Sequence, residues 1–377
     1  MKKRADYTTR ALRYTARFPM LTYVGVQINF WIVANILLVA VMHLQSMIIG
    51  QAFELPIAGR FGAMLLIAVV LGILYGFSLG IAGYYLDRKI FNKLSLGKVI
   101  LFKALGSLML LFILLWLLRF VFFDWIVAPS LHIQDIELSE QSWKYLFFLL
   151  LIYYFFMTLV INFINQVNKK YGPGVVVPLL LGRYREPREE ERVFMFMDLK
   201  SSTSIAEKLG HLKYSALIRD SFMDINDVLL PFQAQVYQYV GDEIVVTWPE
   251  QEGISDHRCI GFYFACKKHL NDRSDYYTAN YGLVPTFKAG VHTGIVTTVE
   301  IGQYKRDIAY HGDTLNTAAR IQSVCNEYDK SFLASKVLLD KVGAHPNMKT
   351  QELGSIQLKG KVAAVELVSV DWIDPVL

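Results

Sequence analysis

Two aspartates of the 377-residue chain follow apolar, strand-like segments at positions where carboxylates could hold a cation. Asp198 ends the run VFMFMDL, and Asp242 lies at the tip of a predicted hairpin in QYVGDEIVV. Mg²⁺ binds one or two carboxylates together with substrate phosphates, and a pair of metal ions can activate a hydroxyl and stabilise a leaving group. The two aspartates are therefore consistent with divalent-cation binding for phosphate chemistry, although aspartates at such positions are often plain turn residues.

Two further motifs carry side chains suited to a nucleotide. The run LKSST, which ends at Thr203, opens a predicted helix whose free backbone N–H groups could bind phosphates. The run HGDTLNTAARIQ predicts a helix that begins near Thr314 and carries Asn316 and Arg320 four residues apart, on one face. An amide and a guanidinium on one face could hold a ribose and a phosphate in transfer. For that spacing alone, a helix with a solvated arginine is the better explanation.

The elements that must position these residues follow from the apolar pattern after Val193. Strands are predicted at VFMFMDL, on both sides of Gly241-Asp242, and at TFKAGVHTGIVTTVEI. Helices are predicted at 201–210, 214–230 and 261–271, and a loop is expected between the last strand and the helix near Thr314. Strands that alternate with helices indicate a single α/β or α+β domain of about 185 residues.

Four apolar runs precede this domain, and each exceeds the roughly 18 residues expected of a membrane-spanning helix. They cover residues 23–44, 61–86, 99–123 and 145–167. The second run carries glycines at 72, 76, 80 and 83, a spacing that predicts close helix packing. The sequence thus predicts an N-terminal tail at 1–22, a four-span transmembrane domain at 23–167, a junction at 168–192 and a soluble domain at 193–377.

Composition excludes several classes of protein. The chain is 54% hydrophobic and 19% charged, with a mean hydropathy of +0.33, which excludes intrinsic disorder. Three cysteines cannot build a disulfide framework.

The net charge of +5 divides unevenly along the chain. Residues 1–167 hold 14 Lys and Arg against 7 Asp and Glu, whereas residues 168–377 hold 24 against 26. The basic surplus therefore belongs to the ends of the spans, and no nucleic-acid partner is expected. Basic and acidic connections alternate, which predicts a multi-pass protein of the cell (inner or plasma) membrane with both termini in the cytoplasm.

Five motifs in order make the soluble half similar to a known family. They are FMFMDLKSSTSIAEKLG, VYQYVGDEIVVTW, FKAGVHTG, HGDTLNTAARIQ and LGSIQLKGKVAAVEL. Together they resemble the catalytic domain of the class III nucleotidyl cyclases, from about residue 193 to 370. The resemblance implies a multi-domain chain in which the four-helix transmembrane bundle precedes a ferredoxin-like βαββαβ catalytic domain. It also implies a homodimer that binds its substrate at the interface.

The resemblance assigns roles to individual residues. Asp198 and Asp242 are expected to bind two Mg²⁺ or Mn²⁺ ions, with the Leu199 carbonyl as a further ligand. Asn316 is expected to orient the ribose and Arg320 to stabilise the pentavalent phosphate. In the family the aspartates and the Asn/Arg pair of one site come from opposite subunits.

The remaining roles concern the triphosphate and the base. Thr203 and Lys359 are expected to contact the phosphates, with Lys361 as a substitute for Lys359. The base-selecting positions fall at Gln238 and Ala309, where adenylate cyclases commonly have Lys and Asp or Thr. Because glutamine both donates and accepts hydrogen bonds, it could pair with adenine or guanine. The expected activity is conversion of ATP to cyclic AMP; a guanylate or dual-specificity cyclase and a non-catalytic nucleotide-binding membrane receptor are the alternatives.

Overall fold

The structure is a computed structural model that describes residues 7–54, 61–89, 94–117, 119–120, 139–172, 174–357 and 364–373. The chain forms two compact units. One is Phe18–Tyr171, and the other is Gly172–Leu377 together with Met1–Arg17.

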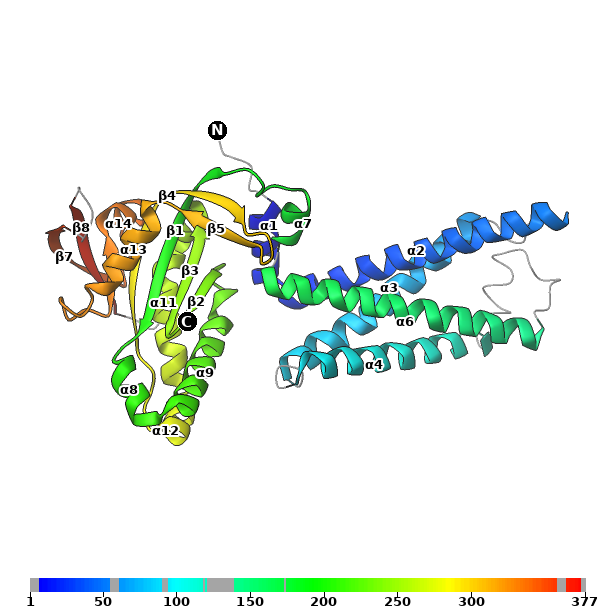
Figure 1. Cartoon of the computed structure of the whole chain (residues 1–377), viewed down its shortest axis with the longest axis horizontal. Helices are drawn as coiled ribbons and strands as arrows, with labels where there is room; N and C mark the ends of the chain where they lie inside the picture. The colour runs from blue at the N-terminus through cyan, green and yellow to red at the C-terminus, as the bar shows by residue number, and fades with distance from the viewer. Residues whose placement is uncertain are drawn as a thin grey trace. The chain divides into compact units, whose positions relative to one another are not determined.

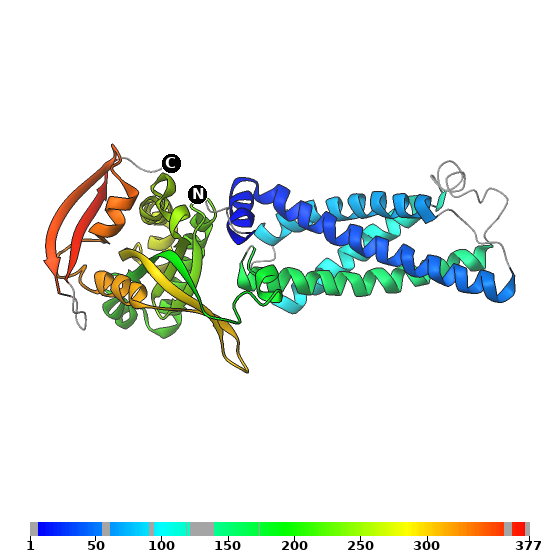
Figure 2. The same cartoon turned by 90° about the horizontal axis from the view of Figure 1, so that it is seen from above.

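Four long helices that run beside one another make up the described part of Phe18–Tyr171 (Figures 1 and 2). They are α2 (Pro19–Phe53), α3 (Phe61–Lys89), α4 (Leu96–Leu117) and α6 (Glu140–Tyr171). Each contains a segment long and apolar enough to cross a membrane. The prediction of four long apolar helices is thereby confirmed. Helices α2, α3 and α6 extend beyond the predicted runs because their polar ends also have helical backbone. Helix α4 ends at Leu117, and residues 118 and 121–123 of the third predicted run lie outside the described residues.

Helices α2 and α3 pack backbone against backbone, as the glycine spacing predicted. A Cβ atom added to Gly72 would lie 2.7 Å from the Cα of Ile32, and one added to Gly76 would lie 2.6 Å from the Cα of Ile28. No side chain larger than glycine fits at these two positions without moving a helix. An aromatic core lies beside this contact. The centroid of the Trp31 ring is 4.3 Å from that of Tyr75 and 5.3 Å from that of Tyr154.

The described residues of the other unit contain an eight-stranded sheet. Its strands run in the order β2-β3-β1-β4-β6-β8-β7, and β5 pairs with β4. Their bounds are β1 (Arg188–Leu199), β2 (Gln235–Val240), β3 (Glu243–Pro249), β4 (Phe287–Ile301), β5 (Asp307–His311), β6 (Phe332–Ser335), β7 (Met348–Ile356) and β8 (Val365–Trp372). The antiparallel order β2-β3-β1-β4, with helices after β1 and β3, is the predicted ferredoxin-like βαββαβ arrangement.

Strand β1 contributes side chains to both faces of the sheet because alternate residues point in opposite directions. Val193, Met195 and Met197 face a large core built with α9 (His211–Leu229) and α11 (Arg258–Asp272). Phe194 faces a second cluster, which includes Ala318 of α13 (Asp313–Ser323). Helices α9 and α11 therefore cover one face of the sheet, and α13 covers the other.

Shorter elements complete this unit. They are α1 (Tyr7–Arg17), α7 (Val176–Leu180), α8 (Ser202–Leu209), α10 (Glu250–Ile254), the 3₁₀ turn Ser255–His257, α12 (Ser274–Tyr281) and α14 (Lys336–Val342). Strands β7 and β8 form a hairpin at the edge of the sheet (red in Figures 1 and 2). Strand β1 begins at Arg188, so it includes residues that the sequence assigned to the junction.

The N-terminal helix α1 is tied to this unit by charge. The Arg13 guanidinium pairs with the Glu252 carboxylate of α10, and its Nε donates to Oε2 over 3.0 Å. Arg258 pairs with the same carboxylate at 3.3 Å. Two cations thus balance a carboxylate that is almost fully buried.

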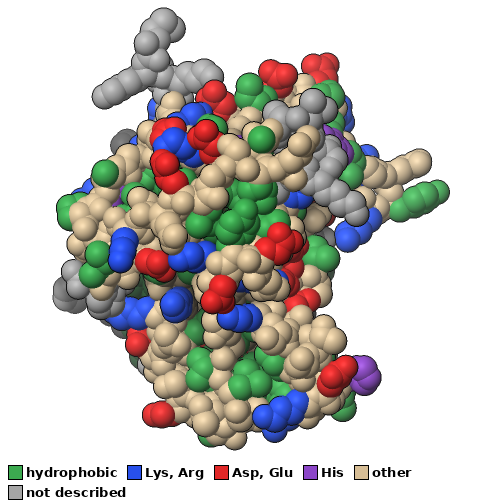
Figure 3. Space-filling view, turned by 90° about the vertical axis from the view of Figure 1, so that its left-hand side faces the viewer, with side chains coloured by type: hydrophobic (Ala, Val, Ile, Leu, Met, Phe, Trp, Pro, Cys, Tyr) green, Lys and Arg blue, Asp and Glu red, His purple; other side chains and the backbone are tan. Residues whose placement is uncertain are grey.

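Charges of both signs are interspersed over the face of the molecule seen in Figure 3. Lys and Arg side chains alternate with Asp and Glu around a central group of hydrophobic side chains. This agrees with the near balance of 24 basic and 26 acidic residues in 168–377.

Candidate active site

The two predicted aspartates lie at neighbouring strand ends. Asp198 is the penultimate residue of β1, and Asp242 occupies the turn between β2 and β3. In the β1–β3 pairing Asp198 is opposite Glu243, the residue after Asp242. The sheet therefore gathers three carboxylates at one end, where sequence reasoning expected two.

The electrostatics of this carboxylate group follow from its crowding. Partial burial raises the pKa of Asp198, and the neighbouring Asp242 charge raises it further. Burial, followed by the charges of Asp198 and Asp242, raises the pKa of Glu243 to about 7. The protein thus holds negative charges close together, an arrangement that a bound cation relieves.

Two side chains from other elements hold the Asp198 carboxylate. Lys288 of β4 lies opposite Asp198 in the β1–β4 pairing, and its Nζ is 3.3 Å from Oδ2. Gln322 of α13 donates its Nε2–H to the same oxygen over 3.2 Å. Side chains directly opposite on paired strands share a face, so Asp198, Glu243 and Lys288 all lie on the α13 side of the sheet.

The donor set fits a hard divalent cation. Carboxylate oxygens are the ligands that Mg²⁺ prefers, and the Asp198 and Asp242 carboxylates lie close enough that the charge of Asp242 raises the pKa of Asp198. Leu199, the further predicted ligand, is 1% exposed and has an apolar side chain, so only its backbone carbonyl could coordinate.

Helix α8 begins shortly after Asp198 and carries Thr203 in its first turn, exposed to solvent. Ser201 precedes the helix in a left-handed conformation with φ 59°, and its side chain makes no capping hydrogen bond. Tyr214 of α9 lies near the same carboxylates: its pKa is raised by burial and then by the charge of Asp242.

Helix α13 presents the predicted Asn316 and Arg320 away from the sheet. Asn316 is exposed and Arg320 is half-buried, whereas Gln322 is buried against Asp198. At 3.6 residues per turn, Asn316 and Arg320 lie on the opposite side of the helix from Gln322. The structure therefore does not bring Asn316 and Arg320 to the aspartates of their own chain.

Two glycines of the FKAGVHTG motif explain how α13 approaches β4 so closely. A Cβ atom on Gly290 would lie 2.1 Å from the Gln322 nitrogen, and one on Gly294 would lie 2.6 Å from Thr314 Oγ1. Glycine is needed at both positions because a Cβ atom would collide with α13. Backbone conformation is not the reason, since neither glycine has a left-handed backbone. They bring Gln322 within reach of Asp198.

The two positions predicted to select the base lie on different strands. Gln238 is exposed on β2, next to a bulge that follows Val236, and Ala309 is 6% exposed on β5. The side chains that meet from these strands are those of their neighbours Tyr237 and Tyr310, whose rings are 5.0 Å apart.

The predicted phosphate lysine Lys359 and its substitute Lys361 lie outside the described residues. Among the described residues, sequence reasoning missed Lys288, Glu243, Gln322 and Tyr214. Lys288, Glu243 and Gln322 stand in motifs already singled out, but only the strand pairing and the packing of α13 show which side chains they face.

Comparison with known proteins relates this unit to a family. Residues 185–369 match the family described as "Adenylate and Guanylate cyclase catalytic domain". This match agrees with the resemblance seen in the sequence motifs, and the matched region follows, along the chain, four helices suited to crossing a membrane.

Among individual proteins, the chain is similar to "Adenylate cyclase 2" of Rhizobium meliloti. The two are 34% identical over 209 residues, which cover 55% of this chain and 58% of that protein. "Adenylate cyclase 1" of the same organism is 24% identical over 48% of this chain and 27% of its own length. The chain thus matches only part of the length of these curated relatives. The crystal structure of the adenylyl cyclase CyaB from P. aeruginosa is 18% identical, with a TM-score of 0.43, and covers 49% of this chain and 96% of its own.

Proposed function

We propose that this chain is an integral-membrane adenylate cyclase that converts ATP to 3′,5′-cyclic AMP and pyrophosphate. The observation that carries the proposal is the group formed by Asp198, Asp242 and Glu243 at one end of a cyclase-family sheet. The names of the two R. meliloti relatives support ATP as the substrate.

Asp198, Asp242 and the Leu199 carbonyl would hold two Mg²⁺ or Mn²⁺ ions. When bound, such ions activate the ribose 3′-hydroxyl and stabilise the pyrophosphate leaving group. The raised pKa of Asp198 supports this assignment, because a carboxylate crowded by like charge gains most from a cation. Lys288 would give up its ion pair with Asp198 as the site fills.

The triphosphate would lie over the first turn of α8. Its N–H groups are available there because Ser201 makes no side-chain cap, and the exposed Thr203 hydroxyl adds a donor. Lys359 would supply a positive charge to the same phosphates.

Asn316 and Arg320 would act on a substrate held by a second copy of the chain. Within one protomer they lie on the side of α13 away from Gln322 and Asp198, so they cannot complete that protomer's own site. A homodimer with twofold symmetry would supply Asn316 and Arg320 of each protomer to the aspartates of the other. Asn316 would then orient the ribose, and Arg320 would stabilise charge on the phosphate in transfer.

Base selection would depend on Gln238 and Ala309. The exposed Gln238 amide can donate to adenine N1 or accept from adenine N6, whereas Ala309 offers no side-chain hydrogen bond. We therefore expect ATP to be the preferred substrate with lower selectivity than a lysine would give, and guanylate or dual-specificity activity is the alternative.

The charge distribution supports a location in the cell (inner or plasma) membrane, with both termini in the cytoplasm. The basic segments lie before α2, between α3 and α4 and at the end of α6, and the connection between α4 and α6 is acidic. This orientation leaves the cyclase unit in the compartment that contains ATP.

A product assay tests the proposed activity. Purified full-length protein in lipid discs is incubated with Mn²⁺ and either ATP or GTP, and cyclic nucleotides are measured. We expect cyclic AMP to dominate and Asp242→Asn to reduce it by at least roughly a hundredfold. Exclusive cyclic GMP formation would contradict the adenylate assignment, and absence of both products with nucleotide binding intact would favour the non-catalytic receptor.

A further inference from the structure

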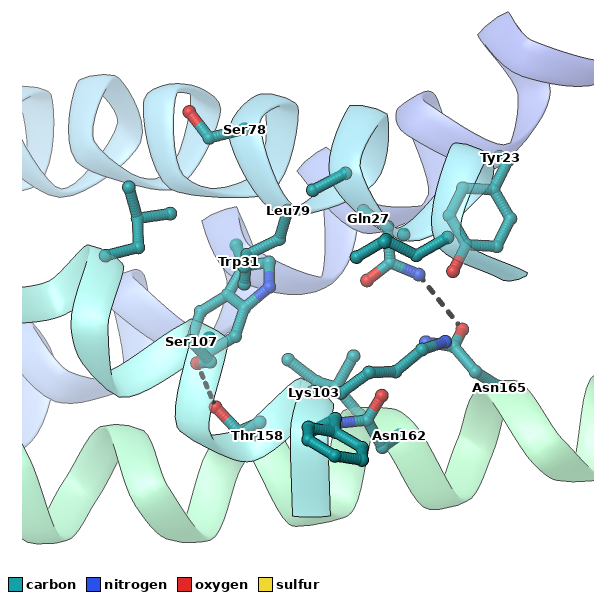
Figure 4. A pocket seen from close by; sticks show the side chains of 17 residues that line it. Tyr23, Gln27, Trp31, Ser78, Leu79, Lys103, Ser107, Thr158, Asn162 and Asn165 are labelled. Atoms are coloured by element: carbon teal, nitrogen blue, oxygen red, sulfur yellow. Dashed lines mark hydrogen bonds between the residues drawn. The ribbon is translucent and has the colours of Figure 1, made fainter. Parts of the chain in front are cut away.

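The four apolar helices line a partly open cavity of about 220 Å³ (Figure 4). All four line it: Trp31 belongs to α2, Leu79 to α3, Lys103 to α4 and Asn162 to α6. The cavity lies wholly within the unit Phe18–Tyr171 and far in sequence from the cyclase residues. A molecule bound in this cavity would therefore occupy a site distinct from the candidate active site.

Buried amides form part of its wall. Gln27 donates its Nε2–H to Asn165 Oδ1 over 3.1 Å, and both side chains are buried (Figure 4). Asn162, one turn before Asn165, is also buried and lines the same space. Polar groups in the interior of a membrane-spanning bundle are costly and therefore mark functional positions.

Trp31 supplies the strongest indication of a ligand. It is 1% exposed, and its indole Nε1–H has no hydrogen-bond partner among the described residues. The ring is fixed by the stacked Tyr154 and the edge of Tyr75. Figure 4 shows the indole nitrogen on the side of the ring that faces Gln27 and Lys103. A buried donor held toward a cavity requires an acceptor there.

The two buried charges beside the cavity match each other: Lys103 Nζ lies 2.8 Å from Asp87 Oδ1. Lys169 Nζ also lies 2.8 Å from Asp87 Oδ2, but its side chain is half exposed. Because Asp87 takes up the charge of the buried Lys103 and the additional charge of Lys169 is exposed, the site does not call for an anion. Its occupant should be uncharged and should carry an acceptor for Trp31.

Size and wall chemistry restrict the occupant further. A dry cavity of about 150 Å³ in another protein binds benzene, so 220 Å³ admits one ring with a short substituent. Leu79, Phe102 and Ile161 provide apolar walls for the ring. We propose that the cavity binds an uncharged molecule of the size of one substituted aromatic ring, with a carbonyl oxygen that accepts a hydrogen bond from Trp31 Nε1.

The test compares two probes of matched shape on the full chain in lipid discs. Acetophenone carries a carbonyl on an aromatic ring, and α-methylstyrene replaces that oxygen by a methylene group. Binding is measured by equilibrium dialysis, with protein-free discs as the blank. We expect saturable binding of both, with acetophenone roughly five- to tenfold tighter because of one added hydrogen bond.

Variants distinguish the contribution of the Trp31 hydrogen bond to binding from that of the cavity volume. Trp31→Phe keeps a ring beside Tyr75 and Tyr154 and should lower acetophenone affinity to that of α-methylstyrene, while Trp116→Phe on the exposed surface of α4 should not. Gly106→Leu places a side chain where an added Cβ meets no atom, so it should fill the cavity and abolish both affinities. Gly25→Leu, equally open but outside the cavity lining, is its control.

Three results would overturn the proposal. They are binding no greater than that of protein-free discs, equal affinity for the two probes, and acetophenone affinity unchanged in Trp31→Phe. An infrared measurement gives an independent readout, since the acetophenone carbonyl band should shift to lower frequency on binding and should not shift in Trp31→Phe.

Discussion

Lys288 and Gln322 both contact the Asp198 carboxylate, so a cation that binds there must compete with a lysine already in place. The Lys288 side chain is largely buried, and therefore its charge is weakly screened by solvent. The lysine neutralises part of the carboxylate group while no cation is bound, and it opposes the binding of one.

Replacing Lys288 by Met should therefore tighten cation binding. Loss of a positive charge 3.3 Å from Asp198 is expected to raise Mn²⁺ affinity by roughly three- to tenfold. Titration of the full chain with Mn²⁺ by calorimetry measures the change. Lys341→Met is the control, because its amine pairs with Glu250 at 2.7 Å instead. Unchanged or weaker binding in Lys288→Met would refute the competition.

The three cysteines should be unreactive in the folded protein. Burial raises the pKa of the Cys259 and Cys325 thiols to about 12 and raises that of Cys266 well above its usual value. A raised pKa keeps a thiol protonated below that pH, and only the thiolate is nucleophilic. At pH 8 an aromatic disulfide reagent should label none in the native state and all three in denaturant. Rapid labelling of any native cysteine would contradict this burial.

Some residues of the candidate site could be predicted from the sequence, and others could not. Asp198 and Asp242 each follow an apolar run and could be found from neighbours along the chain. Lys288 and Gln322 meet Asp198 only because β4 pairs with β1 and α13 packs on β4. Such contacts depend on pairings between distant segments, which local patterns do not specify.

Among the elements, the long periodic segments were predicted well, whereas strands β5, β6, β7 and β8 were not predicted. The predicted helix 214–230 corresponds to α9 and the predicted strand TFKAGVHTGIVTTVEI to β4. Strand β5 was expected to be a loop, because its five residues DIAYH do not alternate and are ordered only by pairing with β4. The membrane helices were predicted from length and composition alone.

The close contact between α2 and α3 should make the bundle sensitive to a larger side chain at Gly76. Gly76→Val would force a side chain against the Ile28 backbone and should destabilise the bundle by about 1–3 kcal/mol or more. Thermal unfolding of the full chain in lipid discs measures the loss. Gly62→Val, on the same helix with no atom within 4 Å of its Cβ, is the matched control and should unfold like wild type. Equal stability of the two variants would argue against this packing.

Over the whole molecule, the sequence was sufficient to predict one apolar, basic part of the chain and one part with nearly balanced charges. It was not sufficient to predict the polar cavity between the apolar helices. Gln27, Asn165 and Lys103 are isolated polar residues within apolar runs, and only the packed bundle brings them to one cavity. The family match to residues 185–369 covers the soluble unit, so the sequence motifs and the fold agree there.

We propose that two copies of the chain share each active site. Mixing two inactive variants of the chain tests this directly. Asp242→Asn and Arg320→Ala proteins, each expected to retain no more than about 1% activity, are produced separately and together in full length. A mixed dimer contains one intact site, so co-produced protein should regain roughly a quarter of wild-type cyclic AMP formation. If the activity of the mixture is no higher than that of the single variants, the two copies do not share their active sites.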